Sequence, residues 1–319
     1  MYTQLLGRPA RVAGILMSAL LATAVLAACS GTPQATGAPS VATSPSAAAS
    51  PETSTSPSAE TSPSESASPA AQLDVEAKDF SFVAPAQVAA GVTRVTVNNT
   101  GQEEHQAQIV RINDDKTFAD LTAALQQPDP AAALALVTLS GGPTGVVPGA
   151  TGSTTVNLEP GAHAFLCFVA GADGIPHLAK GMVLPVEVTG EAAEGEAPAG
   201  DGELTLQDFA FVGLSSVTPG AHTIKVTNTG PQPHEATLVK LSEGVTAAAL
   251  AQMFASGEAP SGPPPFTSAG GISGISAGSS AAMDIDVTAG EYAFICFIPD
   301  PGTGKSHAEL GMVGGLTVQ

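Results

Sequence analysis

Residues 164–168 are AFLCF, and residues 293–297, 129 positions further along, are AFICF. Three more stretches repeat at this offset: KDFSFV (78–83) with QDFAFV (207–212), VNNTG (97–101) with VTNTG (226–230), and Gly141-Gly142 with Gly270-Gly271. An offset held over about ninety residues indicates a duplicated domain, because it is far longer than a solenoid repeat. The sequence therefore predicts two domains, copy 1 (73–190) and copy 2 (203–319), joined by a Glu/Ala/Gly/Pro linker at 191–202.

Each copy has the pattern of a β-rich domain. The 35 Gly and 26 Pro among 319 residues favour turns and short strands over long helices. Residues 93–97 and 222–226 alternate apolar and polar side chains, as half-buried strands do. One helix is predicted in each copy, near residues 118–127 and 245–256. We therefore expect an all-β fold of two tandem, antiparallel Greek-key β-sandwiches, each with a short inserted helix.

Two sets of potential metal ligands occupy matching places in the copies. Each set has a His after the Asn-Thr-Gly turn, a Cys on a late strand, a His in the following loop and a Met five residues later. They are His105, Cys167, His177 and Met182 in copy 1, and His234, Cys296, His307 and Met312 in copy 2. Two imidazoles, a thiolate and a weak axial thioether are the donors of a type 1 (blue) copper site. A lone buried Cys is usually a small hydrophobe, so metal-free sandwiches are one alternative, and Zn(II) at the same ligands is another.

The order and spacing of these ligands resemble the cupredoxin family. In both copies an Asn-Thr-Gly turn leads to the first His, and the other ligands follow as Cys-x9-His-x4-Met in copy 1 and Cys-x10-His-x4-Met in copy 2. The resemblance covers both copies and implies one type 1 copper per domain on the eight residues named. Two features depart from it. The Cys-to-His loop is longer than in plastocyanin or azurin and closer to that of nitrite reductase, and 61 residues separate His105 from Cys167.

The N-terminus has the features of an export signal. Arg8 and Arg11 are followed by 17 uncharged residues at 12–28, which end in Leu26-Ala27-Ala28 just before Cys29. This ending resembles a bacterial lipobox, which implies a signal peptide at residues 1–28 and a lipid on Cys29. An ordinary cleaved signal and an uncleaved membrane anchor are the alternatives, although a bilayer span needs about 20 residues.

A segment without core-forming residues follows the signal. Residues 29–72 are mainly Ser, Thr, Pro and Ala, with no aromatic or basic side chain, and so predict a disordered tether. We expect the folded domains to lie outside the cytoplasm, lipid-anchored to the outer face of the bacterial cytoplasmic membrane. The net charge of −19 argues against nucleic acid as a partner.

The residues that flank each Cys favour electron transfer over catalysis. In multicopper oxidases and nitrite reductase, which the resemblance brings in, His residues beside the Cys connect it to a second copper centre. Here the flanking residues are apolar: Leu166 and Phe168 in copy 1, Ile295 and Phe297 in copy 2. The sequence has no His-x-His, and of its six histidines only His163 and His222 lie outside the ligand sets. We expect both to be solvent-exposed strand residues.

These observations predict a one-electron carrier that is not an enzyme and that exchanges electrons with a redox protein the sequence does not identify. Copper buffering or delivery is the first alternative, although Met-rich and His-rich tracts are absent from the sequence. A structural or adhesive sandwich without metal is the second. A disulfide between Cys167 and Cys296 is disfavoured, because matching positions of two domains normally lie far apart.

Overall fold

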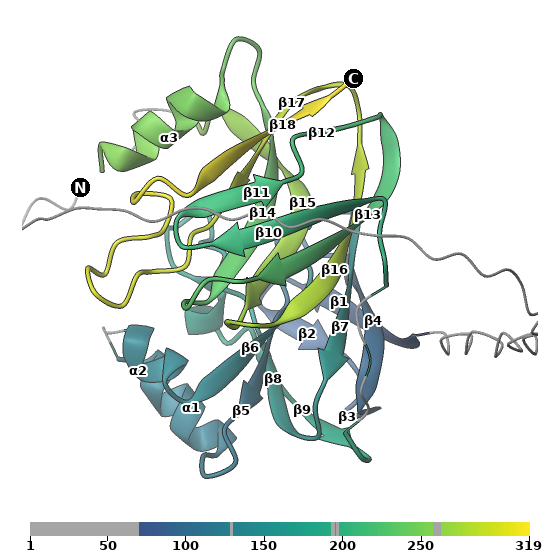
Figure 1. Cartoon of the computed structure of the whole chain (residues 1–319). Coiled ribbons are helices and arrows are strands. Elements are labelled where there is room, and N and C mark those ends of the chain that lie inside the picture. The colour runs from purple at the N-terminus through teal and green to yellow at the C-terminus, as the bar shows by residue number, and fades with distance from the viewer. Residues whose placement is uncertain (1–69, 128–129, 193–194, 196–197, 258–262) are drawn as a thin grey trace, which may run out of the picture. The chain divides into compact units, whose positions relative to one another are not determined.

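The computed structural model describes residues 70–127, 130–192, 195, 198–257 and 263–319 (Figure 1). The predicted signal peptide, Cys29 and most of the predicted tether lie outside the described residues. All described residues fall in one compact unit, and strands dominate it in both copies, as predicted. The domain and linker boundaries drawn from the sequence stay predictions.

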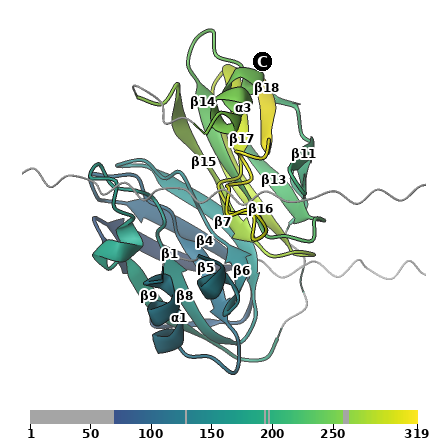
Figure 2. The same ribbon diagram turned by 90° about the vertical axis from the view of Figure 1, so that its left-hand side faces the viewer.

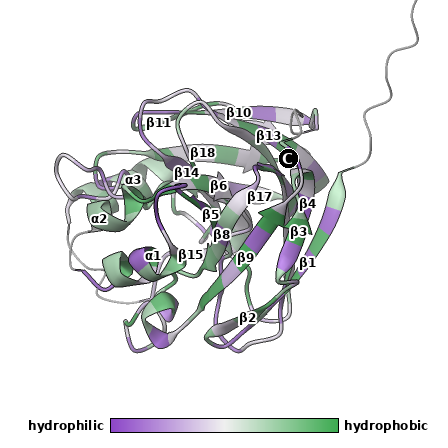
Figure 3. Ribbon diagram, turned by 90° about the horizontal axis from the view of Figure 1, so that it is seen from below, coloured by the Kyte–Doolittle hydropathy of each residue, from purple (hydrophilic) through white to green (hydrophobic). Residues whose placement is uncertain are grey.

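Copy 1 is a sandwich of two sheets with strand orders β2-β1-β4-β7 and β6-β5-β8-β9-β3. Its strands are rich in Val and Thr, which suit a pleated, half-buried surface, and β1 alternates between hydrophilic and hydrophobic residues along its length (Figure 3). The elements are β1 (Ala71–Lys78), β2 (Ser81–Val83), β3 (Gln87–Ala89), β4 (Gly91–Asn99), β5 (Gln108–Ile112), α1 (Phe118–Leu125), α2 (Pro130–Leu134), β6 (Val137–Gly141), β7 (Thr151–Leu158), β8 (Gly161–Leu166), η1 (His177–Lys180) and β9 (Val183–Thr189).

Copy 2 repeats this arrangement with strand orders β11-β10-β13-β16 and β15-β14-β17-β18-β12. The elements are β10 (Gly202–Gln207), β11 (Ala210–Gly213), β12 (Ser216–Val217), β13 (Gly220–Asn228), β14 (His234–Leu241), α3 (Ala247–Ala255), β15 (Phe266–Ile275), β16 (Ser280–Val287), β17 (Gly290–Ile295) and β18 (Val313–Val318).

The two copies share both sheets. Strand β7 pairs with β16 and β6 pairs with β15, so an eight-stranded and a ten-stranded sheet each run through both copies (Figure 2). Thr154 pairs with Met283, and Pro143 forms a bridge with Ile272. Each pair joins equivalent positions of the repeat, so the copies meet about a local two-fold axis. The sequence repeat did not predict this joint.

The sequence predicts antiparallel sandwiches, but some of the strand pairings are parallel. Four pairings are parallel among the described residues: β1 with β4, β3 with β9, β10 with β13, and β12 with β18. In copy 1 the chain leaves the first sheet after β2, contributes β3 to the second sheet and then returns. This crossing brings β4 back beside β1 in the same direction.

The predicted helices pack on the outer face of the ten-stranded sheet. Leu121 of α1 and Leu250 of α3 are each 1% exposed and anchor separate apolar clusters against the strands. Thr117 and Thr246 cap the two helices by accepting a backbone N–H. Copy 1 also has α2, which the sequence analysis missed although its alanines are strong helix formers. None of the helices in the described ranges is long and apolar enough to cross a membrane.

Candidate metal centres

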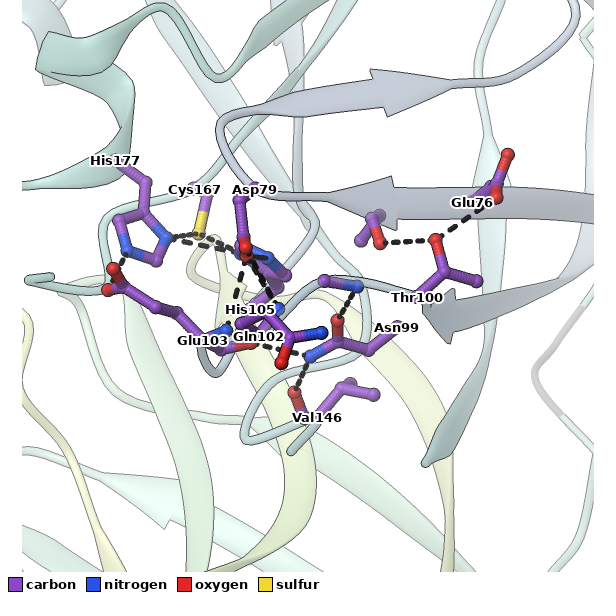
Figure 4. Close-up of polar contacts among 12 residues, drawn as sticks. Glu76, Asp79, Asn99, Thr100, Gln102, Glu103, His105, Val146, Cys167 and His177 are labelled. Atoms are coloured by element: carbon purple, nitrogen blue, oxygen red, sulfur yellow. Dashed lines mark hydrogen bonds and ion pairs between the residues drawn. The ribbon is translucent and has the colours of Figure 1, made fainter. Parts of the chain in front are cut away.

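The structure brings three of the copy 1 candidates together at one end of the sandwich. The ligand atoms of His105, Cys167 and His177 all lie within 4.8 Å of one another, and each residue is fully buried. Cys167 Sγ lies 3.9 Å from His105 Nδ1 and 3.5 Å from His177 Nδ1, and the two Nδ1 atoms are 3.1 Å apart (Figure 4). His105 and His177, which lie 62 and 10 positions from Cys167 in the sequence, thus present their donor atoms to one point together with its sulfur.

Copy 2 repeats this geometry. Cys296 Sγ lies 3.9 Å from His234 Nδ1 and 3.3 Å from His307 Nδ1, and the Nδ1 atoms are 3.0 Å apart. All three residues are again fully buried. The agreement between the copies shows that the ligand arrangement belongs to the repeated unit.

Backbone hydrogen bonds close the loop that carries three of the four candidates. In copy 1, Leu178 N donates to Cys167 O at 2.8 Å, and Met182 N donates to His177 O at 3.0 Å. Cys167 N in turn donates to Met182 O at 3.3 Å. Met182 is fully buried and directly precedes β9, so the Cys-to-Met spacing is fixed by a closed ring of main-chain bonds.

The copy 2 loop forms the same bonds despite its extra residue. Ala308 N donates to Cys296 O at 2.8 Å, and Met312 N donates to His307 O at 2.8 Å. Met312 is also fully buried. The additional residue lies between the bridge pair Pro299 and Ser306, away from the main-chain ring.

The Asn-Thr-Gly turn fixes the first His of each copy. The Asn99 amide donates to Glu103 O at 2.8 Å and to Val146 O at 2.7 Å, and its oxygen accepts the N–H of Gly101 at 2.9 Å. Asn228 makes the corresponding three bonds in copy 2. The turn therefore ties the segment that carries the first His to the neighbouring loop.

Each His also has a hydrogen-bond partner on its outer nitrogen, which the sequence analysis did not identify. In copy 1, His105 Nε2 lies 3.2 Å from Asp79 Oδ1, and His177 Nε2 lies 3.0 Å from Glu103 Oε2 (Figure 4). A carboxylate can only accept, so both Nε2 atoms carry the proton and both Nδ1 atoms present lone pairs to the Cys. Outer partners of this kind hold a metal-binding imidazole in the correct tautomer and orientation.

The outer partners of copy 2 differ at one position. His234 Nε2 lies 2.8 Å from Asp208 Oδ1, and His307 Nε2 lies 3.2 Å from Gln232 Oε1. Gln232 Nε2 donates to Asp300 Oδ1 at 3.1 Å, which leaves the amide oxygen to face His307. The repeated KDFSFV and QDFAFV stretches supply the two Asp residues, so the signal was present in the sequence without its role.

The Phe that directly follows each of these Asp residues contacts the second His of the same site. Phe80 and Phe209 have positive φ values of 65° and 60°, which are uncommon for residues other than Gly. The rings lie T-shaped against His177 and His307, with centroid distances of 5.0 and 5.1 Å. The strained turn thus places an Asp on one His of the site and a Phe on the other.

The glycine of each Asn-Thr-Gly turn is required by close approach. A Cβ at Gly101 would lie 2.3 Å from Asp79 Oδ1 and 2.8 Å from His105 Nε2. At Gly230 the corresponding distances, to Asp208 Oδ1 and His234 Nε2, are 2.7 and 2.9 Å. Any side chain at this position would separate the Asp from the His.

The electrostatics of the cluster suit a bound cation. Burial raises the pKa of Cys167 to about 11 and raises the pKa of Cys296 further. Burial lowers the pKa of His105, and burial with the nearby charge of His234 lowers that of His307 to about 4. In each site two imidazole lone pairs and one sulfur face each other with a single thiol proton between them. A metal cation satisfies all three donors and deprotonates the thiol.

Each copy has one further acid beside its site, the partly buried Glu104 in copy 1 and the buried Glu235 in copy 2. Burial raises the pKa of Glu104, whose Oε2 accepts the Ser268 hydroxyl of copy 2 at 2.5 Å. Burial raises the pKa of Glu235 to about 7. Its carboxyl accepts Phe297 N at 2.7 Å, and its own backbone N–H points to Cys296 Sγ at 3.4 Å.

The structure also bears on the expected absence of a disulfide and on the two histidines outside the ligand sets. Cys167 and Cys296 are free thiols in separate clusters, so the disfavoured disulfide is not formed. The prediction that His163 is exposed is wrong, since only 2% of it is accessible. Strand alternation places His163 on the same face of β8 as Phe165, which packs in the sandwich core. His222 is partly exposed, and neither His joins a metal-binding cluster among the described residues.

The fold and donor set confirm the resemblance to cupredoxins. Each copy is a β-sandwich with a His–Cys–His cluster and a buried Met at one end, and the set fits one type 1 copper ion per copy. The structure adds the outer partners, the shared sheets and the second helix of copy 1 to what the sequence predicted.

Comparisons with known proteins found similar solved structures at low overall similarity. No family model and no curated protein sequence matches the chain. Reduced auracyanin from Roseiflexus castenholzii matches at 23% identity and a TM-score of 0.25, over 37% of this chain and 94% of its own. Copper nitrite reductase from Thermus scotoductus matches at 14% identity and a TM-score of 0.21, over 78% and 61% of the two chains. The enzyme from Nitrosomonas europaea matches at 16% identity and a TM-score of 0.22, over 79% and 94%.

Proposed function

We propose that the chain is an exported, lipid-anchored electron carrier with two type 1 copper sites. The observation that carries the proposal is the repeated, fully buried His–Cys–His cluster whose donor atoms converge within 4.8 Å in both copies. Copper bound at such donors supplies one-electron chemistry by cycling between Cu(II) and Cu(I).

The support around the ligands favours a carrier over a copper delivery protein. Main-chain bonds close each Cys-to-Met loop, and each His is held on its outer nitrogen by a carboxylate or an amide. A site held by this much surrounding structure keeps its geometry when the metal changes charge. Delivery requires ligands that open to release the ion, whereas these ligands have no accessible surface.

The absence of catalytic activity is also part of the proposal. The residues next to Cys167 and Cys296 are Leu, Ile and Phe, so neither Cys has a neighbouring His that could connect it to a second copper. Phe168 and Phe297, which directly follow the two Cys residues, remain 43% and 42% exposed. They offer an apolar contact near each site to a redox protein partner.

Export and anchoring rest on the sequence of residues 1–29. The run that ends at Cys29 supports cleavage and lipid attachment there, which would hold the domains at the outer face of the cytoplasmic membrane. Replacing Cys29 by Ala should release an unlipidated protein from the membrane fraction. Recovery of the variant with the membrane at the wild-type level would contradict lipid anchoring.

The metal proposal is tested by titrating the full-length protein with Cu(II). We expect an intense blue thiolate-to-copper band, with Cys167→Ser and Cys296→Ser each removing the contribution of one copy. The double variant should be colourless. Reversible voltammetry of the loaded protein should show one-electron waves, whereas irreversible loss of copper on reduction would favour buffering or delivery. A protein that takes up no copper would favour the metal-free sandwich.

A further inference from the structure

The two candidate copper sites differ in the group that holds the second His. Positions 103 and 232 are equivalent in the repeat, and they are Glu in copy 1 and Gln in copy 2. Glu103 Oε2 lies 3.0 Å from His177 Nε2 (Figure 4), and Gln232 Oε1 lies 3.2 Å from His307 Nε2. The first His of each copy has an Asp in both cases, so the second His carries the asymmetry.

A carboxylate and an amide affect a metal-bound imidazole differently. An ionised acceptor makes a hydrogen bond roughly twice as strong as a neutral one, and it draws the Nε2 proton outward. The ring then becomes a stronger donor at Nδ1, which favours the more highly charged oxidation state of a bound metal. Gln232 also accepts the Nε2 proton but brings no charge, because its carboxylate neighbour, Asp300, lies one hydrogen bond further out.

We propose that Glu103 gives the copper site of copy 1 a lower reduction potential than Gln232 gives the site of copy 2. The proposal rests on the proposed function, since it requires copper at both sites. When the protein holds one electron, copy 1 is in the Cu(II) state and copy 2 in the Cu(I) state. An electron delivered to copy 1 would reduce Cu(II) to Cu(I) there. Its transfer to copy 2 would return copy 1 to Cu(II) and reduce Cu(II) of copy 2 to Cu(I), with no proton transferred.

Among the described residues, no charged group other than Glu103 forms a hydrogen bond to the outer nitrogen of the second His in either site. Each site has one Asp on its first His. Each also has one further acid nearby, the partly buried Glu104 in copy 1 and the buried Glu235 in copy 2, at positions that do not correspond in the repeat. Lys180 lies over the Phe80 ring in copy 1, but its ammonium pairs with Asp173 at 2.8 Å. Position 103/232 therefore differs in charge at direct hydrogen-bond distance from a ligand.

The test exchanges the two residues in the full-length, copper-loaded protein and measures potentials through the blue band. Wild type should titrate in two one-electron waves. Glu103→Gln should raise the lower wave toward the upper one, and Gln232→Glu should lower the upper wave toward the lower one. We expect about a tenfold change in the Cu(II)/Cu(I) equilibrium for each exchange, which is about 59 mV for a one-electron couple. The double exchange should restore two waves with the copies reversed.

Asp114→Asn is the matched control, because it removes one negative charge from a side chain that is 83% exposed and lies outside the site. It should leave both waves in place. Coincident waves in wild type, or a Glu103→Gln shift no larger than that of Asp114→Asn, would overturn the inference while both sites still bind copper. Absence of the blue band would instead overturn the proposed function and this inference with it. Cys167→Ser and Cys296→Ser each leave one intact site, so they assign each wave to one copy. The wild-type titration decides whether the potentials of the two copies differ.

Discussion

Replacing Gly101 by Ala probes the contact that aligns the first His of copy 1. The new Cβ would lie 2.3 Å from Asp79 Oδ1, whereas ordinary contact begins at 3.4 Å, so the carboxylate must retreat by about 1.1 Å. This retreat breaks the 3.2 Å bond to His105 Nε2 and weakens the bonds from Gln102 N and Glu103 N. Because Asp79 is partly exposed, we expect a loss of about 2–4 kcal/mol in the free energy of unfolding.

The copper affinity of copy 1 should fall about 10–100-fold, as for other losses of an outer partner. It is measured on the blue band in a Cys296→Ser background, and stability is measured by guanidinium unfolding. Gly149→Ala is the control, because its Cβ meets nothing within 4 Å and only its positive φ of 76° is strained. It should destabilise by about 1–2 kcal/mol and leave the band unchanged. Gly230→Ala should be milder than Gly101→Ala, since its contact is 2.7 Å. An unchanged affinity in Gly101→Ala, or the reverse ranking, would refute the reasoning.

Three further predictions concern the scaffold and its pH dependence. Thr154 Oγ1 is buried without a hydrogen-bond partner among the described residues, so Thr154→Val should stabilise the protein by about 1 kcal/mol in guanidinium unfolding. Leu121→Ala should cost about 2–5 kcal/mol while copy 1 keeps its blue band, because α1 packs on the outer face of the sheet; loss of the band at full folding would contradict this. Burial raises the pKa of Glu235 to about 7 from 4.5, so its contribution to stability is complete below pH 4.5 and is lost as the pH rises through about 7. Metal-free Glu235→Gln should therefore gain stability relative to wild type across this range, and parallel pH profiles would contradict the assignment.

The candidate ligands could be identified from the sequence because they are side chains at fixed spacings in a repeated sequence, and the structure brings the His and Cys of each set together. Their outer partners were not, although the Asp-Phe pairs were visible as repeats. The role of Asp79 depends on the left-handed backbone conformation at Phe80, which the conformational preference of Phe does not predict. Glu103 reaches His177 across 74 positions of sequence, and contacts of that kind follow from the packed fold.

Other differences have similarly local reasons. His163 could have been predicted as buried, because it shares the two-residue period of Phe165 and Cys167. The parallel pairing of β1 with β4 depends on the crossing through β3, which strand patterns do not encode. The joint between the copies pairs positions such as Thr154 and Met283. Their side chains differ in kind, so no repeated residue marks the joint in the sequence.

The shared sheets have a consequence for how such a duplicated protein can change. Strands β6 and β7 of copy 1 would be unpaired edges if copy 2 were removed, and β15 and β16 would be unpaired if copy 1 were removed. Unpaired edges promote association with other chains, so natural proteins keep them protected. Each copy protects the other, which means that a mutation can silence one metal site but deletion of either domain exposes two strands. The two metal sites can therefore diverge in chemistry, while the two copies must stay together to keep these strand edges covered.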